Sequence, residues 1–494
     1  MMETKTYTFW FLTGSQHLYG QETLDLVAEQ ARGIIEGLNG SGLPYEIKVK
    51  PVLTTREEIR NVIRDANYSS ECAGIITWMH TFSPAKMWID GLNILQKPML
   101  HLHTQFNRDI PWDAIDMDYM NLNQSAHGDR EFGFMVSRMN IDRKVVSGHW
   151  SNEDVQVKIK DWMHSAVGHA ENKKVKVVRF GDNMRRVAVT EGDKVEAQMK
   201  FGWTVDGYGV GDLVNYLNAF SDSEVEARFK EYEHEYKMSS AITSDLAVKQ
   251  SVLGQARIEL GLQAFFKEEG YNAFTTTFED LHGMPQLPGL AAQRLMEQGY
   301  GFAGEGDWKT AALLRMMKVM TNNEKTVFME DYTYHLEPGK EMVLGSHMLE
   351  ICPTVANHQP EIQVHPLGIG GKADPARMVF DGIGGHAVNA ALIDLGHRFR
   401  LVINEVDAVV PTQETPNLPV AKLLWTPQPN LATATEAWIH SGGAHHTVLS
   451  FTASVEQLLD WAEMSEIEAV VINKNTDVRS LKERLRWNEL VWKN

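Results

Sequence analysis

The chain has 494 residues, of which 43% are apolar and 23% are charged, and it carries a formal net charge of −18. The negative charge excludes a protein that binds the nucleic-acid backbone, because no basic surplus exists to release counterions. The length predicts about three domains. With only two cysteines the chain has no disulfide framework, which favours a reducing compartment. Neither a signal peptide nor a membrane span is evident, and we expect a cytoplasmic protein.

The first part of the chain alternates strand and helix patterns, which predicts a parallel, doubly wound α/β domain over residues 1–172. Thr54 and Glu57 fit a capping box at the start of one of its helices. Other helices are expected over 22–38, 84–95 and 152–171. Ligands in such sheets bind beyond the carboxyl ends of the strands. The segments expected there are GSQHLYG, HTFSP and HTQFN, after the strands at 7–13, 73–79 and 98–103.

A second α/β domain is predicted over residues 173–325. It begins at KKVKVVRFGDN and contains long amphipathic helices over 222–238 and 246–268. The stretch DGYGVGD (206–212) resembles a phosphate-binding loop. Its glycines have the wrong spacing and no strand leads tightly into them, so we expect a flexible loop and no nucleotide site.

From Thr326 onward the pattern changes to short β-type runs separated by turn residues, such as FRLVINEVDAVV and AKLLWTP. This pattern is typical of an antiparallel barrel or sandwich over residues 326–494, with a late helix at 454–463 and a strand at EAVVIN. The expected fold class is therefore α/β, with two doubly wound α/β domains followed by a C-terminal antiparallel β-barrel-like domain.

The stretch GFAGEGDWKT places Glu305 between two glycines, which tolerate backbone angles that other residues resist. Its side chain can therefore be aimed by the backbone. Asp307 stands where the N-cap of the following helix is expected. A turn, a cap and a solvated glutamate would explain the same residues, so a functional interpretation needs partners elsewhere in the chain.

Two β runs around the turn EPGK supply possible partners. If Leu336 pairs with Glu341, the same register places Glu330 opposite His347. Directly opposed residues have Cβ atoms about 5 Å apart, so the two side chains could hold one divalent ion. A surface ion pair between the strands is the alternative.

His445 and His446 follow a Gly-Gly turn. Adjacent side chains of an extended segment point to opposite faces, so only one of the two histidines can line a given site. A structural pair of histidines is the alternative. Two carboxylates and two imidazoles together would suit a borderline ion such as Mn²⁺, with positions left for substrate oxygens.

Six motifs in chain order closely resemble the L-arabinose isomerase family: GSQHLYG, NLNQSAHGDREFGF, GEGDWKTAALLR, FMEDYTYH, LGSHMLEICP and GGAHHTV. The resemblance spans essentially the whole chain. It implies three domains, a hexamer or tetramer, and pockets built between neighbouring subunits. It also implies one Mn²⁺ per subunit, with Glu305, Glu330, His347 and His446 as ligands and the two glutamates as acid and base.

The resemblance also implies a sugar pocket. Its residues would be Gln16, Leu18, Tyr19, Gln124, His127, Met184, Phe278 and Ile369. Asp307 and Glu350 correspond to acidic positions that the family needs for activity. Leu18, Met184, Phe278 and Ile369 are residue types that usually belong to a core, and only the resemblance assigns them to the pocket.

The expected reaction converts L-arabinose to L-ribulose, and D-galactose to D-tagatose, without a nicotinamide or phosphate site. A divalent ion would polarise the substrate oxygens, and metal-bound carboxylates would move the protons through an ene-diol. Three other interpretations of the function remain open. They are a fucose-type isomerase, a non-haem iron oxygenase with two histidines and one carboxylate, and a sugar-binding protein without catalysis.

Overall fold

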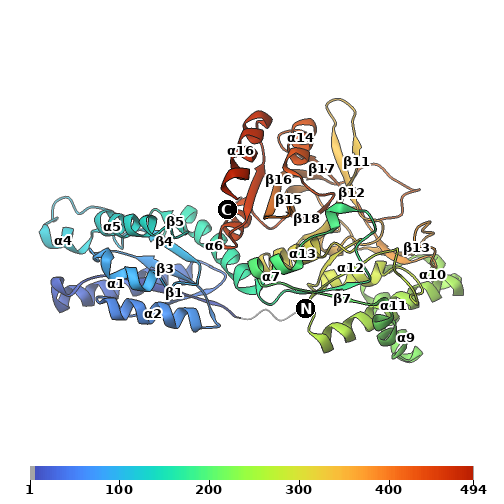
Figure 1. The fold of residues 1–494 in the computed structure, drawn as a ribbon, viewed down its shortest axis with the longest axis horizontal. Helices are drawn as coiled ribbons and strands as arrows, with labels where there is room; N and C mark the ends of the chain where they lie inside the picture. Colours follow the sequence, from blue (N-terminus) through green and yellow to red (C-terminus); the bar gives the residue numbers. More distant parts are fainter. Residues whose placement is uncertain (1–5, 493–494) are drawn as a thin grey trace. The chain divides into compact units, whose positions relative to one another are not determined.

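The computed structural model describes residues 6–492 as two compact units. The N-terminal unit comprises residues 6–170 together with 456–464, and the larger unit comprises 171–455 and 465–492. Figure 1 shows the order of the elements in each. Among the described residues, no helix is both long and apolar enough to cross a membrane.

The N-terminal unit is built on a parallel sheet of order β2-β1-β3-β4-β5. All seven residues of the central strand β3 are buried, as expected for a strand covered on both faces. The strands are β1 (Thr8–Thr13), β2 (Glu46–Val49), β3 (Cys72–Trp78), β4 (Met99–His103) and β5 (Lys144–Ser147). The helices are α1 (Gly20–Gly40), α2 (Arg56–Tyr68), α3 (Ile89–Leu92), α4 (Met117–Leu122), α5 (Ser125–Arg138) and α6 (Glu153–Asn172). The doubly wound prediction is confirmed.

The capping box at the start of α2 lies one residue later than predicted. Thr55 accepts a hydrogen bond from the backbone N–H of Glu58, and the Glu58 carboxylate accepts one from the backbone N–H of Thr55. Thr54 also donates to Glu58, so both threonines compete for one carboxylate. Sequence spacing alone cannot choose between them.

The larger unit begins with a second parallel sheet, of order β10-β9-β6-β7. Its strands are β6 (Lys176–Phe180), β7 (Thr204–Tyr208), β9 (Ala273–Thr276) and β10 (Gly301–Ala303). Its helices are α7 (Lys194–Phe201), α8 (Val210–Asn218), α9 (Asp222–Glu235), α10 (Ser240–Ser244), α11 (Leu246–Glu269), α12 (Gly289–Glu297) and α13 (Trp308–Met320).

The predicted flexible loop at 206–212 is wrong. Residues 206–208 complete the strand β7, Gly209 is the N-cap of α8, and the helix begins at Val210. The Asp212 carboxylate accepts a hydrogen bond from the backbone N–H of Gly209 at 3.1 Å. The Asp212 carboxylate therefore caps the first turn of α8. The glycines of this stretch form a tight connection between β7 and α8.

A closed barrel forms the C-terminal part of the larger unit. The sheet order is β15-β18-β11-β12-β17-β16-β19, and an additional pairing of β15 with β16 closes the ring, which leaves no open edge among those six strands. Its strands are β11 (Thr326–His335), β12 (Met342–Ser346), β15 (Gly385–Asp394), β16 (Phe399–Val409), β17 (Leu423–Pro427), β18 (His446–Ser450) and β19 (Glu468–Ile472). Only β19 pairs in parallel, with β16. The helices α14 (Leu431–Ser441) and α16 (Val478–Val491) also belong to the larger unit, whereas α15 (Val455–Met464) falls almost entirely in the N-terminal unit.

One helix joins the central sheet to the barrel. Every residue of α13 is buried, and the helix contacts β6, β9 and β10 of the sheet as well as β11, β15 and β18 of the barrel. A small sheet of order β14-β13-β8 adds a further link, with β8 (Lys237–Met238), β13 (Glu361–Val364) and β14 (Ala376–Val379). Sheet and barrel therefore share one core, and the start of α13 lies where that core meets the strand ends.

Candidate metal centre

The turn between β10 and α13 holds Glu305 in a left-handed backbone conformation, with φ of 60°. Gly306 follows with φ of 79°, and a Cβ there would lie 2.6 Å from the Cα of Asn183. A Cβ on Gly304 would lie 2.7 Å from Cε1 of His347. The glycines are needed because an imidazole and a neighbouring backbone occupy the space of their missing side chains. Together they aim Glu305 toward that imidazole.

Asp307 is the N-cap of α13, as predicted, and its side chain is almost fully buried. It accepts hydrogen bonds from the backbone N–H and the hydroxyl of Thr310, and it lies 3.4 Å from the ammonium of Lys309. Burial alone would raise the pKa of Asp307, but Lys309 and the contact with His446 hold it well below its usual range. Asp307 is thus a fixed anion beneath the turn.

His446 is the first residue of β18 and is fully buried. Its Nδ1 lies 3.2 Å from Oδ2 of Asp307, which fixes the orientation of the ring. Its Nε2 has no hydrogen-bond partner among the described residues and lies 3.9 Å from Oε2 of Glu305. A buried nitrogen without a partner is costly. A metal ligand held by a carboxylate on its other nitrogen has this arrangement.

The alternation argument for the two histidines does not hold. His445 precedes β18 in a bend, so its side chain is not forced to the opposite face. Its Nε2 lies 3.7 Å from Oε2 of Glu305, and the two histidine rings are 4.4 Å apart. Both histidines therefore approach the same glutamate. The close approach of His445 is the main cause that lowers the pKa of Glu305.

His347 follows directly after β12 and is buried. Its Nδ1 lies 2.6 Å from Oε2 of Glu350, an interaction that leaves Nε2 available. Burial would lower the pKa of His347, but the charge and hydrogen bond of Glu350 raise it. The ligand atoms of Glu305, His347 and His446 lie within 4.8 Å of one another. Glu350 thus supports His347 as Asp307 supports His446.

Glu330 is not opposite His347, because the hairpin contains a β-bulge. His335 pairs with Met342 as the predicted register requires, but the register shifts between Asp331 and Thr333, so Glu330 pairs with Ser346. On its other side Glu330 pairs with His446 of β18, which therefore shares its face of the sheet. The expected neighbour was wrong, but Glu330 still adjoins the cluster through His446.

Phe328 is a member of this site that the sequence did not reveal. Its ring lies 4.9 Å from the ring of His347 and 5.2 Å from that of His446. It stands two residues before Glu330 on β11, so both side chains occupy one face of the strand. That alternation was the only available signal. Phe328 excludes water from one side of the two imidazoles.

Three predicted sugar-binding residues meet in the N-terminal unit, beyond the carboxyl ends of its strands. Gln124 is the N-cap of α5 and donates to the hydroxyl of Tyr19 at 3.3 Å, while its Oε1 lies 3.1 Å from Nδ1 of His127. The ring of Phe82, from the HTFSP segment, lies 4.8 Å from that of His127. We name Tyr19, Gln124, His127 and Phe82 the polar cluster.

Two further predicted residues lie beside the polar cluster in sequence. Gln16 is the N-cap of a 3-10 helix (His17–Tyr19) that follows β1, and Leu18 lies within this helix and is 83% exposed. The side chain of Gln16 forms no cap hydrogen bond to this helix. Such an exposed leucine is not a core residue, so burial in the core does not explain its side chain.

The remaining predicted pocket residues lie in the larger unit. Met184 donates its backbone N–H to the carbonyl of Glu305 at 2.9 Å. Ile369 lines a cavity of about 290 Å³ that is also lined by Ser346 and Met348, the two neighbours of His347. Phe278 lies beside the same loop, because a Cβ on Gly370 would be 3.5 Å from its Cβ. All three are half-buried.

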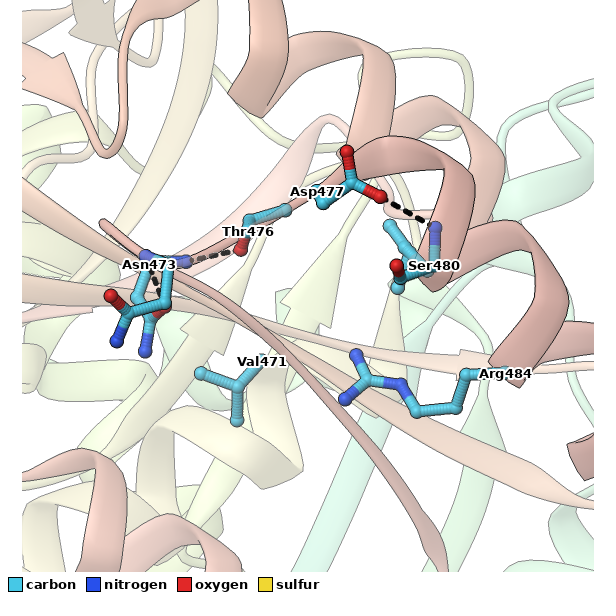
Figure 2. Close-up of a pocket in the computed structure, with 8 residues that line it drawn as sticks. Val471, Asn473, Thr476, Asp477, Ser480 and Arg484 are labelled. Atoms are coloured by element: carbon cyan, nitrogen blue, oxygen red, sulfur yellow. Dashed lines mark hydrogen bonds between the residues drawn. The ribbon is translucent and has the colours of Figure 1, made fainter.

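Another cavity, of about 370 Å³, opens where β19 leads into α16 (Figure 2). Its polar groups are engaged in the turn itself. The Thr476 hydroxyl accepts from the backbone N–H of Asn473 at 2.8 Å, and Asp477 caps the helix by accepting from that of Ser480 at 2.8 Å (Figure 2). None of the predicted site residues lies in this cavity, and its lining resembles an ordinary helix cap.

Comparison with known proteins identifies the class of enzyme to which this centre belongs. Residues 3–174, 176–323 and 325–468 match the models of the L-arabinose isomerase N-terminal, central and C-terminal domains. The chain is therefore an isomerase, an intramolecular oxidoreductase that interconverts an aldose and a ketose.

Relatives over the full length define the family more closely. The chain is 62% identical to the L-arabinose isomerase of Halalkalibacterium halodurans, over 99% of each chain. It is 60% identical to that of Bacillus subtilis, over 100% of this chain and 99% of the relative, and 62% identical to that of Geobacillus stearothermophilus, over 100% of both. The chain belongs to the L-arabinose isomerase family.

A solved periplasmic sugar-binding protein of an ABC sugar transporter from Legionella pneumophila is 12% identical to this chain. The match covers 64% of this chain and 95% of that one, with a TM-score of 0.15. A likeness this weak supports no argument about fold or function.

Proposed function

We propose that this protein converts L-arabinose to L-ribulose, and accepts D-galactose as a second substrate, with one divalent ion held by Glu305, Glu330, His347 and His446. The observation that carries the proposal is the buried cluster of Glu305, His347 and His446, in which Nε2 of His446 has no hydrogen-bond partner within residues 6–492. The full-length family match supports the choice of sugar. Such a reaction belongs to arabinose catabolism, and its enzyme would act in the cytoplasm.

The donor set fits a borderline ion such as Mn²⁺. Two imidazoles and carboxylate oxygens are the ligands that such ions accept, and the carboxylates of Asp307 and Glu350 already hold the far nitrogens of both imidazoles. When bound, the ion would supply Lewis acidity to the oxygens at C1 and C2 of the sugar. The residues of the chain then have to position the sugar and move two protons.

The two glutamates would move those protons. A carboxylate is a competent base for the C2 hydrogen once the neighbouring oxygen is polarised, and a second carboxylate can shuttle the hydroxyl proton. Glu305 is presented by the left-handed turn, and Glu330 by the strand opposite His446. Lys309 and His446 keep Asp307 anionic, so Asp307 would position His446 and take no part in proton transfer.

The polar cluster would bind the sugar hydroxyls. Tyr19, Gln124 and His127 offer hydroxyl, amide and imidazole groups that can both donate and accept hydrogen bonds. We propose that they serve the metal centre of a neighbouring subunit in a hexamer or tetramer. Met184, Phe278 and Ile369 would then line the apolar side of the pocket beside Glu305 and His347.

The test is turnover by the chelator-treated full chain after it is reloaded with Mn²⁺. Incubation with a panel of aldoses, scored for ketose, should give L-ribulose from L-arabinose as the fastest reaction. His446→Ala should abolish turnover, whereas the matched control His440→Gln, a surface histidine of α14 beside Glu436, should retain it. Sugar binding without any ketose would contradict an isomerase and indicate a binding protein.

A further inference from the structure

A second cluster of ligand-type side chains lies in the N-terminal unit. Nε2 of His101 is 2.9 Å from Oδ1 of Asp129, and Nδ1 of His103 is 2.8 Å from Oδ2. One ligand atom from each residue lies within 4.8 Å of the others. Bonds of about 2.1 Å to one ion place neighbouring ligand atoms about 3.4 Å apart in tetrahedral geometry, so three ligand atoms within 4.8 Å of one another can close on a shared ion.

The three groups are brought together by their positions on β4 and α5. His101 and His103 are two residues apart on β4, so their side chains share one face of the sheet. Asp129 lies near the start of α5, where the backbone N–H of Met79 donates to its Oδ1 at 3.0 Å. A Cβ on Gly128 would lie 2.5 Å from the carbonyl oxygen of Thr81, so this glycine lets α5 approach closely.

A buried carboxylate lies between the two imidazoles of this cluster. Asp129 is 2% exposed, and its ion pairs among the described residues are with the two histidines, not with a lysine or arginine. A buried carboxylate is costly unless it is paired with a cation. The hydrogen bond to Asp129 raises the pKa of His103, so either a proton on that imidazole or a bound cation can supply the opposite charge. A divalent ion would supply charge and accept all three groups as ligands.

We propose that His101, His103 and Asp129 bind a divalent transition-metal ion, such as Zn²⁺ or Co²⁺. Two imidazole nitrogens and one carboxylate form a donor set that suits such ions, and the half-exposed His103 offers a path of entry. The ion ties β4 to α5, the helix that carries His127 and is capped by Gln124. It stabilises the polar cluster and takes no part in the reaction.

The alternative is a purely hydrogen-bonded triad, in which Asp129 orients two histidines without metal. Metal content separates the two. The full chain is stripped with chelator, reloaded with Co²⁺, freed of excess by gel filtration and assayed for cobalt per chain. We expect about two ions in the wild type and about one in His446→Ala. His103→Gln should also hold about one, and the double variant none.

Two controls make the result interpretable. His440→Gln, the same change on the surface of α14, should keep both ions. Circular dichroism should confirm that His103→Gln is folded. In His446→Ala, whose first centre is disabled, added Zn²⁺ should still raise the melting temperature, because an ion that binds only the native state stabilises it.

The outcomes are distinct from those that test the reaction. One ion in the wild type, unchanged in His103→Gln, would overturn this proposal and leave the proposed isomerase intact. An absence of any Zn²⁺-induced shift in His446→Ala would overturn it as well. Two ions with no ketose formed would instead support this second site and contradict the proposed reaction.

Discussion

The candidate metal centre of the larger unit and the polar cluster of the N-terminal unit differ in how firmly their side chains are held. His347 and His446 are buried, and each ring is fixed by a buried carboxylate. Tyr19, Gln124 and His127 contact one another near solvent, beside a leucine that is 83% exposed, and no buried carboxylate holds any of the three in the described contacts. The difference teaches that the proposed chemical centre is preorganised by buried carboxylates, whereas the proposed sugar-binding residues are left open to completion by a partner or substrate.

The first prediction concerns Glu305 of the candidate metal centre and has the largest expected effect. Glu305→Gln should lower kcat by about 10²-fold or more, the usual scale for a lost general acid or base. Bound Mn²⁺ should be weakened but not abolished, because an amide oxygen can still coordinate. Turnover and metal content are measured together. The control is Glu337→Gln at the exposed hairpin turn; equal losses in both variants would remove Glu305 from the mechanism.

The second prediction concerns the support of His446. Asp307→Asn can still cap α13 but no longer offers a full negative charge to Nδ1 of His446. Mn²⁺ affinity should fall about 10- to 100-fold, the scale found for groups that orient metal ligands. Asp477→Asn makes the same change at the exposed cap of α16. Unchanged affinity in Asp307→Asn would show that the carboxylate serves the helix alone.

The third prediction tests why Gly304 has no side chain. Gly304→Ala would place a methyl group 2.7 Å from the His347 ring, so the ring must shift. Overpacking of this kind costs about 1–3 kcal/mol. We expect weaker Mn²⁺ binding and a lower melting temperature. Gly211→Ala on α8, where no atom lies within 4 Å of the added carbon, is the control. Wild-type metal binding in Gly304→Ala would contradict the close-approach argument.

The fourth prediction addresses the open region and has the smallest effect. Tyr19→Phe removes one hydroxyl that accepts from Gln124. A lost hydrogen bond is worth about 1 kcal/mol, so KM for L-arabinose should rise about fivefold while metal content stays the same. Tyr68→Phe, at an exposed position on α2, should leave KM unchanged. A loss of bound Mn²⁺ in Tyr19→Phe would break the distinction between the two regions.

Much of the fold could be predicted from the sequence because the patterns were strong. The strand–helix alternation defined the first sheet, and the glycines around Glu305 together with the cap at Asp307 marked the turn of the metal centre. The motif resemblance supplied the choice of His446 and the residues proposed for the sugar pocket, which stay a prediction. These features depend on short stretches whose residue types can be interpreted without the rest of the chain.

The details that were missed depend on tertiary structure. The bulge between Asp331 and Thr333 shifts the pairing of Glu330 by one residue, and no turn residue in the sequence indicates its position. His445 bends toward Glu305 because β18 begins only at His446. Phe328 contacts two imidazoles that come from distant segments. Each depends on where neighbouring strands begin or slip, which a single sequence does not encode locally.

The central claim is that the glutamates of the candidate centre move one proton from C2 to C1 of the sugar and the other between the two oxygens. Isomerisation of L-arabinose in D₂O, followed by mass and NMR analysis of L-ribulose, tests it most directly. Proton transfer through an ene-diol with a carboxylate base predicts deuterium at C1 of the product. Complete retention of the original hydrogen at C1, with Glu305→Gln still active, would contradict the account and indicate a hydride shift instead.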